Sequence, residues 1–173
     1  MLLDLGILTI RVLIGAAMAA HGAQKLAGWF GGYGLKGTGG FFEQLGFHPG
    51  TLFAGFAGVG EALGGLLLML GLFTPAAAAM VLSAMLVAIA VVHWKNGFFT
   101  AESGIELPFL YAVAALALAL TGPGSFSVDE WLGLSVLRES YVIGGFLLLS
   151  VLGAAATLAA RRTSPVVASA AQH

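Results

Sequence analysis

The sequence predicts an all-α integral membrane protein, a polytopic bundle of five transmembrane helices. Of its 173 residues, 59% are hydrophobic and only 9% are charged, whereas soluble domains average about 45–50% and about 25%. The mean hydropathy of +0.98 means that the chain has too few polar side chains to cover itself in water. The apolar residues form five stretches close to the roughly 20 residues that cross a bilayer core of about 30 Å.

The first predicted span covers about residues 5–26. It is not a typical secretory signal, because Asp4 precedes it without any Lys or Arg, and Arg11 interrupts its apolar run. We therefore expect a membrane helix that is retained. Cations and small residues recur at helical offsets of 4, 7, 11 and 14 and so share one face; this face consists of Arg11, Gly15, Met18, Gly22 and Lys25.

The segment 28–50 is rich in glycine and aromatic residues. Residues 41–45, followed by Gly46, could form a short helix on the membrane surface, but a flexible connector is the favoured interpretation. Residues 32–37 match the pattern G-x-G-x-x-G. They follow a membrane helix rather than a strand, so the context of a dinucleotide site is absent.

The second and third spans cover about residues 51–72 and 75–94. Only a tight turn separates them, which predicts an antiparallel helical hairpin. Thr74 is suited to cap the third span, with Pro75 in its first helical position.

The fourth span, about residues 106–121, is the shortest of the five. Ser103 and Glu106 have the spacing of a capping box at its start, and Gly122-Pro123-Gly124 ends it. A fifth span covers about residues 141–160. The predicted organisation is a four-helix core in residues 1–132, an outer loop and fifth helix in 133–162, and a disordered cytoplasmic tail in 163–173.

The cations predict the orientation of the bundle. If the N-terminus is outside, five cations lie on one side of the membrane: Lys25, Lys36, Lys95, Arg161 and Arg162. Only Arg138 lies on the other side, and Arg11 lies within the first span. Because cytoplasmic loops carry an excess of Lys and Arg, we expect an external N-terminus and a cytoplasmic C-terminus.

Glu61, near the middle of the second span, is the most unusual residue. Its neighbours three and four positions away are all small, namely Ala57, Gly58, Gly64 and Gly65, so its face should pack against another helix. Arg11 lies within roughly 7 Å of the same depth at about 1.5 Å per residue, and we expect the two charges to pair. Two interpretations stay open: a buried ion pair that fixes helix register, or a group that carries protons or contacts a ligand.

Four further ionisable residues lie at the predicted cytoplasmic end of the spans: His21, Lys25, His93 and Glu106. Each has a simpler interpretation, since Lys25 could reach the lipid headgroups, His93 could lie at the interface, and Glu106 could close the capping box. A polar pocket shared by all four is the alternative. No metal site is predicted, because metal-binding spacings of His and Glu are absent and the chain has no cysteine.

Several short motifs in order resemble the DoxX family of small bacterial membrane proteins. They are Arg11, His21-Gly22, Lys25-Leu26, Glu61, Gly64-Gly65, residues 70–74 and residues 122–129. The resemblance runs from about residue 10 to 132 and implies a four-helix core, to which the fifth span is an addition. It also implies a place in the bacterial plasma (inner) membrane. It also implies an association with membrane redox chemistry, since relatives include a subunit of a thiosulfate:quinone oxidoreductase and a protein that links sulfur-transfer and superoxide-defence proteins.

The leading functional hypothesis is a membrane subunit of a redox system that binds a quinone or similar lipophilic ligand. Glu61 and His21 would be the catalytic residues, with Arg11, Lys25, His93 and Glu106 contacting the ligand. Alternatives are a non-catalytic anchor of a larger respiratory or oxidative-stress complex, and a carrier of a small solute or proton. Expected partners are the lipid bilayer and other membrane or redox proteins or further copies of the chain, but not nucleic acid. The sequence leaves open whether the chain itself catalyses a reaction.

Overall fold

The computed structural model describes residues 1–162, and all the regular secondary structure in that range is helical. The predicted tail, 163–173, lies outside the described residues. The α-helices are α1 (Leu2–Ala27), α2 (Gly34–Gln44), α3 (Gly50–Leu70), α4 (Thr74–Ala88), α5 (Glu106–Thr121), α6 (Val128–Trp131) and α7 (Ser140–Ala159). A π-helical turn η2 (Ile89–His93) and a 3-10 turn η3 (Trp94–Asn96) continue α4. Three further 3-10 turns are η1 (Trp29–Gly31), η4 (Thr100–Glu102) and η5 (Ser135–Arg138).

Four helices in the described part of the chain are long and apolar enough to cross a membrane: α1, α3, α7 and α4 with its continuation to Asn96. The prediction of an all-α bundle of membrane helices is therefore confirmed. With 16 residues, α5 is about 24 Å long at about 1.5 Å per residue, somewhat short of a bilayer core. The count of five spans stays a prediction.

Helices α1 and α3 approach each other through glycines, as their small faces predict. A methyl group at Gly22 would lie 2.3 Å from the backbone nitrogen of Ala62, and one at Gly15 would lie 2.5 Å from the carbonyl oxygen of Gly65. Neither position leaves room for a side chain. Four of the five residues in the predicted stripe on α1 are buried, and only Lys25 is partly exposed.

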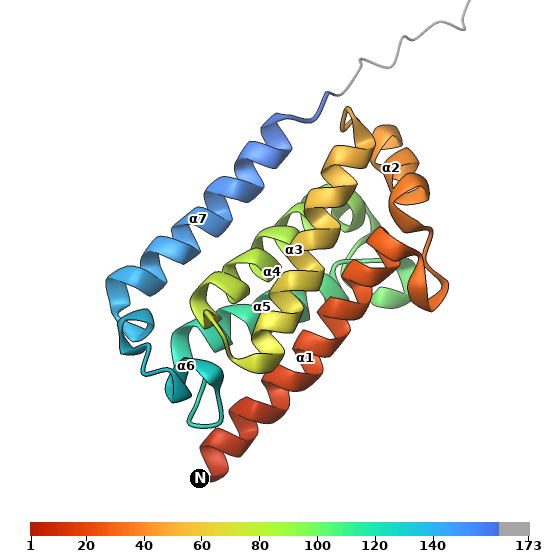
Figure 1. Cartoon of the computed structure of the whole chain (residues 1–173). Helices are drawn as coiled ribbons and strands as arrows, with labels where there is room; N and C mark the ends of the chain where they lie inside the picture. The colour runs from red at the N-terminus through yellow and green to blue at the C-terminus, as the bar shows by residue number, and fades with distance from the viewer. Residues whose placement is uncertain (163–173) are drawn as a thin grey trace, which may run out of the picture.

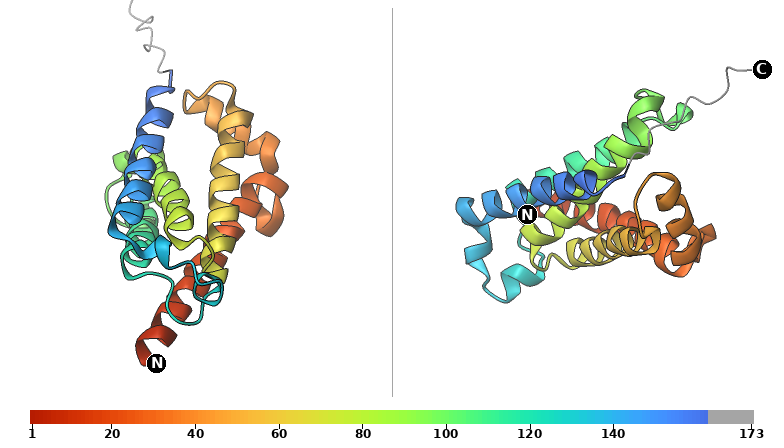
Figure 2. Two further views of the ribbon diagram at one scale, coloured as in Figure 1. Left: turned by 60° about the vertical axis from the view of Figure 1, so that its left-hand side comes forward. Right: turned by 90° about the horizontal axis from the view of Figure 1, so that it is seen from above.

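Helix α4 lies at the centre of the bundle and packs against α3, α5 and α7. The main core gathers around its small apolar face, with Ala77, Ala78 and Val81 fully buried. Figure 1 shows α7 running along the outside of the bundle, and Figure 2 shows α7 and α3 on either side of α4. Most of α7 is exposed, with Ser150 and Ala154 its only buried residues.

Two local predictions were wrong. Residues 34–44 form helix α2 rather than part of a flexible connector, because α2 packs against α3 and buries Thr38, Gly39 and Phe42. Thr74 is the first residue of α4 instead of its cap. The Asp129 carboxylate caps this helix, because it accepts hydrogen bonds from the backbone of Phe73 and from both the backbone and hydroxyl of Thr74.

Candidate functional site

An ion pair between α1 and α3 lies at the centre of the candidate site. Lys25 Nζ is 2.5 Å from Glu61 Oε2. The Glu61 side chain is only 5% exposed and that of Lys25 is 26% exposed. The helices can meet here because Gly58 lies against Leu26 and the Cβ of Lys25. Lys25 therefore neutralises a carboxylate that would otherwise be costly within a membrane helix.

The predicted pair of Arg11 and Glu61 is wrong. The glycine contacts fix an antiparallel register in which Gly15 meets Gly65 and Gly22 meets Ala62. That register places Arg11 beside Gly71, about 15 Å along α3 from Glu61 at about 1.5 Å per residue.

Arg11 instead binds the loop that follows α5. Its guanidinium donates hydrogen bonds to the carbonyl oxygens of Pro123 and Phe126, and weakly, at 3.4 Å, to that of Met69. Arg11 is 1% exposed, so these carbonyls take the place of water around its charge. The contacts assign Arg11 to the architecture of the opposite end of the bundle, away from Lys25 and Glu61.

Both predicted site histidines are anchored by a hydrogen bond from Nδ1 to an oxygen atom. Nδ1 of His93 lies 2.7 Å from the carbonyl oxygen of Ser103. Nδ1 of His21 lies 3.2 Å from Oε1 of Gln24, whose amide nitrogen donates to the carbonyl of Phe30. Because these oxygens accept, each Nδ1 carries the proton, and Nε2 of a neutral ring keeps its lone pair. Within the described residues, neither Nε2 has a hydrogen-bond partner.

Glu106 is not joined to the other ionisable residues. Its Oε2 accepts a hydrogen bond from the backbone nitrogen of Thr100, at 2.9 Å. The predicted capping box with Ser103 is wrong, because Ser103 has a left-handed backbone (φ 62°) and no side chain caps α5. Glu106 thus orders the loop before α5, and it lines neither of the two cavities described below.

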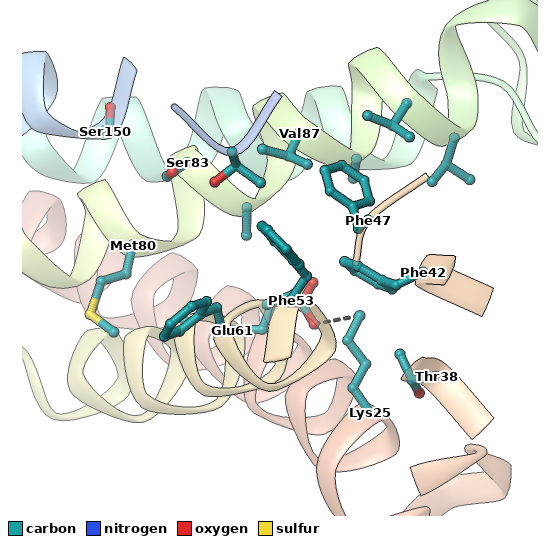
Figure 3. Close-up of a pocket in the computed structure, with 18 of the residues that line it drawn as sticks. Lys25, Thr38, Phe42, Phe47, Phe53, Glu61, Met80, Ser83, Val87 and Ser150 are labelled. Carbon is teal, nitrogen blue, oxygen red and sulfur yellow. Dashed lines mark hydrogen bonds and ion pairs between the residues drawn. The ribbon is translucent and has the colours of Figure 1, made fainter. Parts of the chain in front are cut away.

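The larger cavity, of about 700 Å³, lies between α3 and α7 on a floor formed by α4. Figure 3 shows its lining, which is largely aromatic and aliphatic and includes Phe42, Phe47, Phe53, Met80, Val87, Ser83, Ser150 and Thr38. Lys25 and Glu61 contribute a charged pair to this lining. Its rim includes Phe56 and Leu149, which are 66% and 61% exposed. Both belong to helices that could cross a membrane, so the cavity opens sideways, where lipid chains would lie.

The second oxygen of Glu61 is free. Oε2 accepts from Lys25, while Oε1 has no partner among the described residues. Every buried side-chain oxygen or nitrogen of the described residues has a hydrogen-bond partner. Because Oε1 has none, it is not a buried atom sealed within packed protein. Figure 3 shows one oxygen of Glu61 joined to Lys25 and the other pointing away from it.

A smaller cavity, of about 320 Å³, lies on the other side of the ion pair, between α1, α5 and the continuation of α4. His21, Tyr111, Thr100 and Ser103 line it, and the rings of His21 and Tyr111 meet edge to face, 5.8 Å apart. Lys25, Glu61, Ala88 and His93 line both cavities. The structure therefore brings four of the six predicted site residues together and leaves out Arg11 and Glu106.

No group of three or more His, Asp or Glu side chains within residues 1–162 is arranged to hold a metal ion. His21, Glu61 and His93 line one cavity without forming such a cluster.

Sequence analysis missed the aromatic wall and the π-helical turn. Phe42 and Phe47 reach the larger cavity because α2 folds back onto α3. The π turn, a form often found at functional sites, carries Val91 and Val92 to the larger cavity and His93 to both cavities. The cluster of phenylalanines at residues 41–56 was the available signal for the wall. A continuous apolar run offers no signal for a π turn.

Residues 6–94 match the sequence model of the DoxX family. The chain is also similar to the uncharacterized membrane protein Rv3486 of Mycobacterium tuberculosis, with 29% identity over 134 residues, which are 72% of this chain and 79% of that protein. No solved structure matches the chain. The matched region contains His21, Lys25, Glu61 and His93, and so covers the charged pair that lines both cavities.

Proposed function

Because the chain belongs to the DoxX family of multi-pass membrane proteins, we propose that it binds a quinone or similar lipophilic ligand as the membrane subunit of a redox system. The observation that carries the proposal is the larger cavity, with its apolar walls, its opening toward lipid and one buried charge pair. Ligand sites generally combine an apolar lining of about 300–1,000 Å³ with a few polar groups that orient the ligand.

The charge pair suits the head of such a ligand. The Lys25 ammonium has donors beyond the one used on Glu61 and could bind a ring carbonyl. Glu61 Oε1 is free to accept a hydrogen bond from a ring hydroxyl, or to exchange a proton with it. The phenylalanines would surround the apolar remainder of the ligand. Sequence analysis paired Glu61 with Arg11, but the cation beside Glu61 at this site is Lys25.

We further propose that α5 is a fifth span and that the C-terminus faces the cytoplasm. Supporting this, the end of α7 meets the segment after α2, since Arg161 donates to the carbonyl of Leu45 and the backbone of Arg162 to that of Gly46. These arginines therefore lie at the same end of the bundle as Lys36. Such a cluster of cations is typical of a cytoplasmic face.

The test is ligand binding by the purified chain with a variant that fills the cavity. Gly60 lines the larger cavity, and a Cβ there would approach only the carbonyl of Met80, at 4.0 Å. Gly60→Leu should place a side chain in the cavity without straining the helix, because leucine favours a helix by up to about 1 kcal/mol over glycine. Gly145→Leu, on α7 at a glycine with nothing within 4 Å and outside the cavity lining, is the matched control.

The wild-type chain and Gly145→Leu should retain a quinone through purification, detected by solvent extraction and mass spectrometry. Gly60→Leu should weaken binding of added quinone by about tenfold or more, the effect of losing about 1.4 kcal/mol of contacts. A chain that retains no ligand and is recovered only within a larger complex would contradict the proposal. That outcome would favour a non-catalytic anchor.

A further inference from the structure

We infer that the smaller cavity is an aqueous proton entrance to Glu61, and that His21 and His93 relay protons through it. The inference rests on the proposed function, because it gives the lipophilic site a separate supply of protons. The ion pair of Lys25 and Glu61 would be the partition between a wet cavity and a lipophilic one.

The two cavities differ in their lining and their surroundings. The smaller one is bounded by the loop before α5, where Thr100 and Ser103 are exposed at the end of the bundle. Histidine, tyrosine and hydroxyl side chains line it, and water requires such partners in order to occupy a cavity. The larger cavity also contains hydroxyl side chains, but aromatic and aliphatic side chains predominate in its lining, and its rim includes Phe56 and Leu149. Water and a lipophilic ligand thus have different routes to the same carboxylate.

The hydrogen bonds of the histidines suit proton transfer. Each ring is anchored through Nδ1, to Ser103 or to Gln24, which leaves Nε2 as the atom that takes up and releases a proton. Imidazole changes its charge in the physiological pH range. Both rings line the cavity that also contains Glu61. Two anchored rings, each with one free nitrogen, therefore line the cavity that reaches the carboxylate.

The transfer is a movement of one proton. A hydrated proton adds to Nε2 of a neutral imidazole, and the imidazolium releases a proton from Nε2 through cavity water to Oε1 of Glu61. The imidazole is then neutral again, and Glu61 is a carboxylic acid at the wall of the larger cavity. The ionisable groups around it are His21 and Lys25 from α1, His93 from η2 and Tyr111 from α5. No electron transfer is part of the inference.

Because the chain has no native cysteine, thiol labelling tests the two routes directly. Three single variants on α4 suffice: Met85→Cys in the smaller cavity, Ser83→Cys in the larger one, and Val81→Cys, buried and outside both, as the control. A charged methanethiosulfonate should modify Met85→Cys about tenfold or more faster than the other two, because the thiolate is the reactive form and apolar surroundings suppress it. N-phenylmaleimide, which dissolves in lipid, should modify Ser83→Cys faster than Val81→Cys.

Tyr111→Cys, in the smaller cavity, replaces Met85→Cys if that variant does not fold. Equal, slow labelling of the smaller-cavity variant and Val81→Cys by the charged reagent would overturn the inference. If the wild-type chain binds no quinone but the cysteine variants show the expected labelling pattern, the proposed function is overturned and the proton entrance remains. The two failures are therefore distinguishable.

The relay itself is tested with dicyclohexylcarbodiimide, a lipid-soluble reagent that modifies protonated carboxyl groups. In membrane vesicles of the two opposite orientations, modification of Glu61, measured by mass spectrometry, should follow the pH on the side of the loop before α5. After a pH jump, the double variant His21→Phe, His93→Phe should respond about tenfold more slowly, within the usual range for losing an acid–base group. Modification that follows the pH of the opposite side, or an unchanged response in the double variant, would contradict the relay.

Discussion

Arg11 and Lys25 lie on one face of α1, yet they have different partners. Arg11 is surrounded by backbone carbonyls, and its planar guanidinium suits several acceptors at fixed angles. Lys25 meets a single carboxylate oxygen. Sequence analysis expected Arg11 to pair with Glu61 within the bundle, whereas Lys25 could have reached the lipid headgroups instead. It could not pair them correctly, because the partner depends on the antiparallel register of α1 and α3, and single glycine contacts set that register.

Breaking the pair of Lys25 and Glu61 should destabilise the protein. Removing one member of a buried ion pair typically costs about 3–5 kcal/mol, because the other charge is left without compensation. We expect Lys25→Met and Glu61→Leu each to lower the free energy of unfolding, measured in mixed micelles. The double variant should recover most of the loss but bind no quinone. A double variant that binds quinone as well as the wild type would restrict the pair to a structural role.

Arg11→Lys should loosen the loop after α5. A lysine ammonium cannot reproduce the several N–H donors of the planar guanidinium, which join α1 to the carbonyls of Pro123 and Phe126. Losing hydrogen bonds from a charged group costs about 1.5–3 kcal/mol each, and limited proteolysis should show faster cleavage in residues 122–127. Quinone binding should not change, since Arg11 lines neither cavity. Weakened binding with an intact loop would place Arg11 back in the site.

Among the elements, helix α2 was not predicted from the sequence because of its composition. Four of its eleven residues are glycine, which normally disfavours a helix. Gly39 is needed because a Cβ there would lie 2.6 Å from the side chain of Thr51. Glu43 also accepts a hydrogen bond from the backbone of Gly50 at the start of α3. Contacts with α3 therefore outweigh the local preference, and a single sequence does not reveal such contacts.

The contact between α1 and α3 makes a prediction with a control on the same helix. Gly22→Ala should push the helices apart and cost about 1–3 kcal/mol, the usual penalty of overpacking, because its methyl group would meet the backbone of Ala62. Gly6→Ala should be neutral or slightly stabilising, since nothing lies within 4 Å of that position. Thermal unfolding in detergent measures both. Equal effects at Gly6 and Gly22 would show that the interface does not depend on close approach.

For the whole molecule, the sequence predicted the membrane class and the helix lengths, because these follow from apolar composition and bilayer thickness. It could not predict the cavities, which arise where helices fail to pack. Helix α7 contacts α4 but lies apart from most of α3, and the larger cavity occupies the space between them. Its lining combines side chains from helices distant in sequence, such as Phe53 and Phe146.

Removing α7 should separate folding from ligand binding. A chain that ends at Arg138 keeps the ion pair of Glu130 with Arg138 and the Asp129 cap on α4, so it should insert and remain monodisperse. It loses the wall formed by Phe146, Leu149 and Ser150 and should bind quinone at least about tenfold more weakly, a loss of about 1.4 kcal/mol. Degradation of the shortened chain would make α7 part of the core.

The orientation is tested with reporters at the C-terminus. Five spans with an external N-terminus place the C-terminus in the cytoplasm, on the side richer in Lys and Arg. A fluorescent protein that matures only in the cytoplasm should be bright, and alkaline phosphatase at the same position should be inactive. The reverse result would contradict this topology: either α5 dips into the membrane without spanning it, or five spans have the opposite orientation.

The hydrogen bonds between Arg11 and the loop after α5 also bear on the biogenesis of the protein. Two of the three carbonyl partners of Arg11 lie 112 and 115 residues later in the chain. During synthesis, α1 therefore enters the bilayer with a guanidinium that has none of these partners, at a cost of about 2.5–3.5 kcal/mol near a helix centre. We therefore expect the first helix to become fully stable only after residue 126 has been made, and the nascent chain to depend on the insertion machinery until the loop after α5 has emerged.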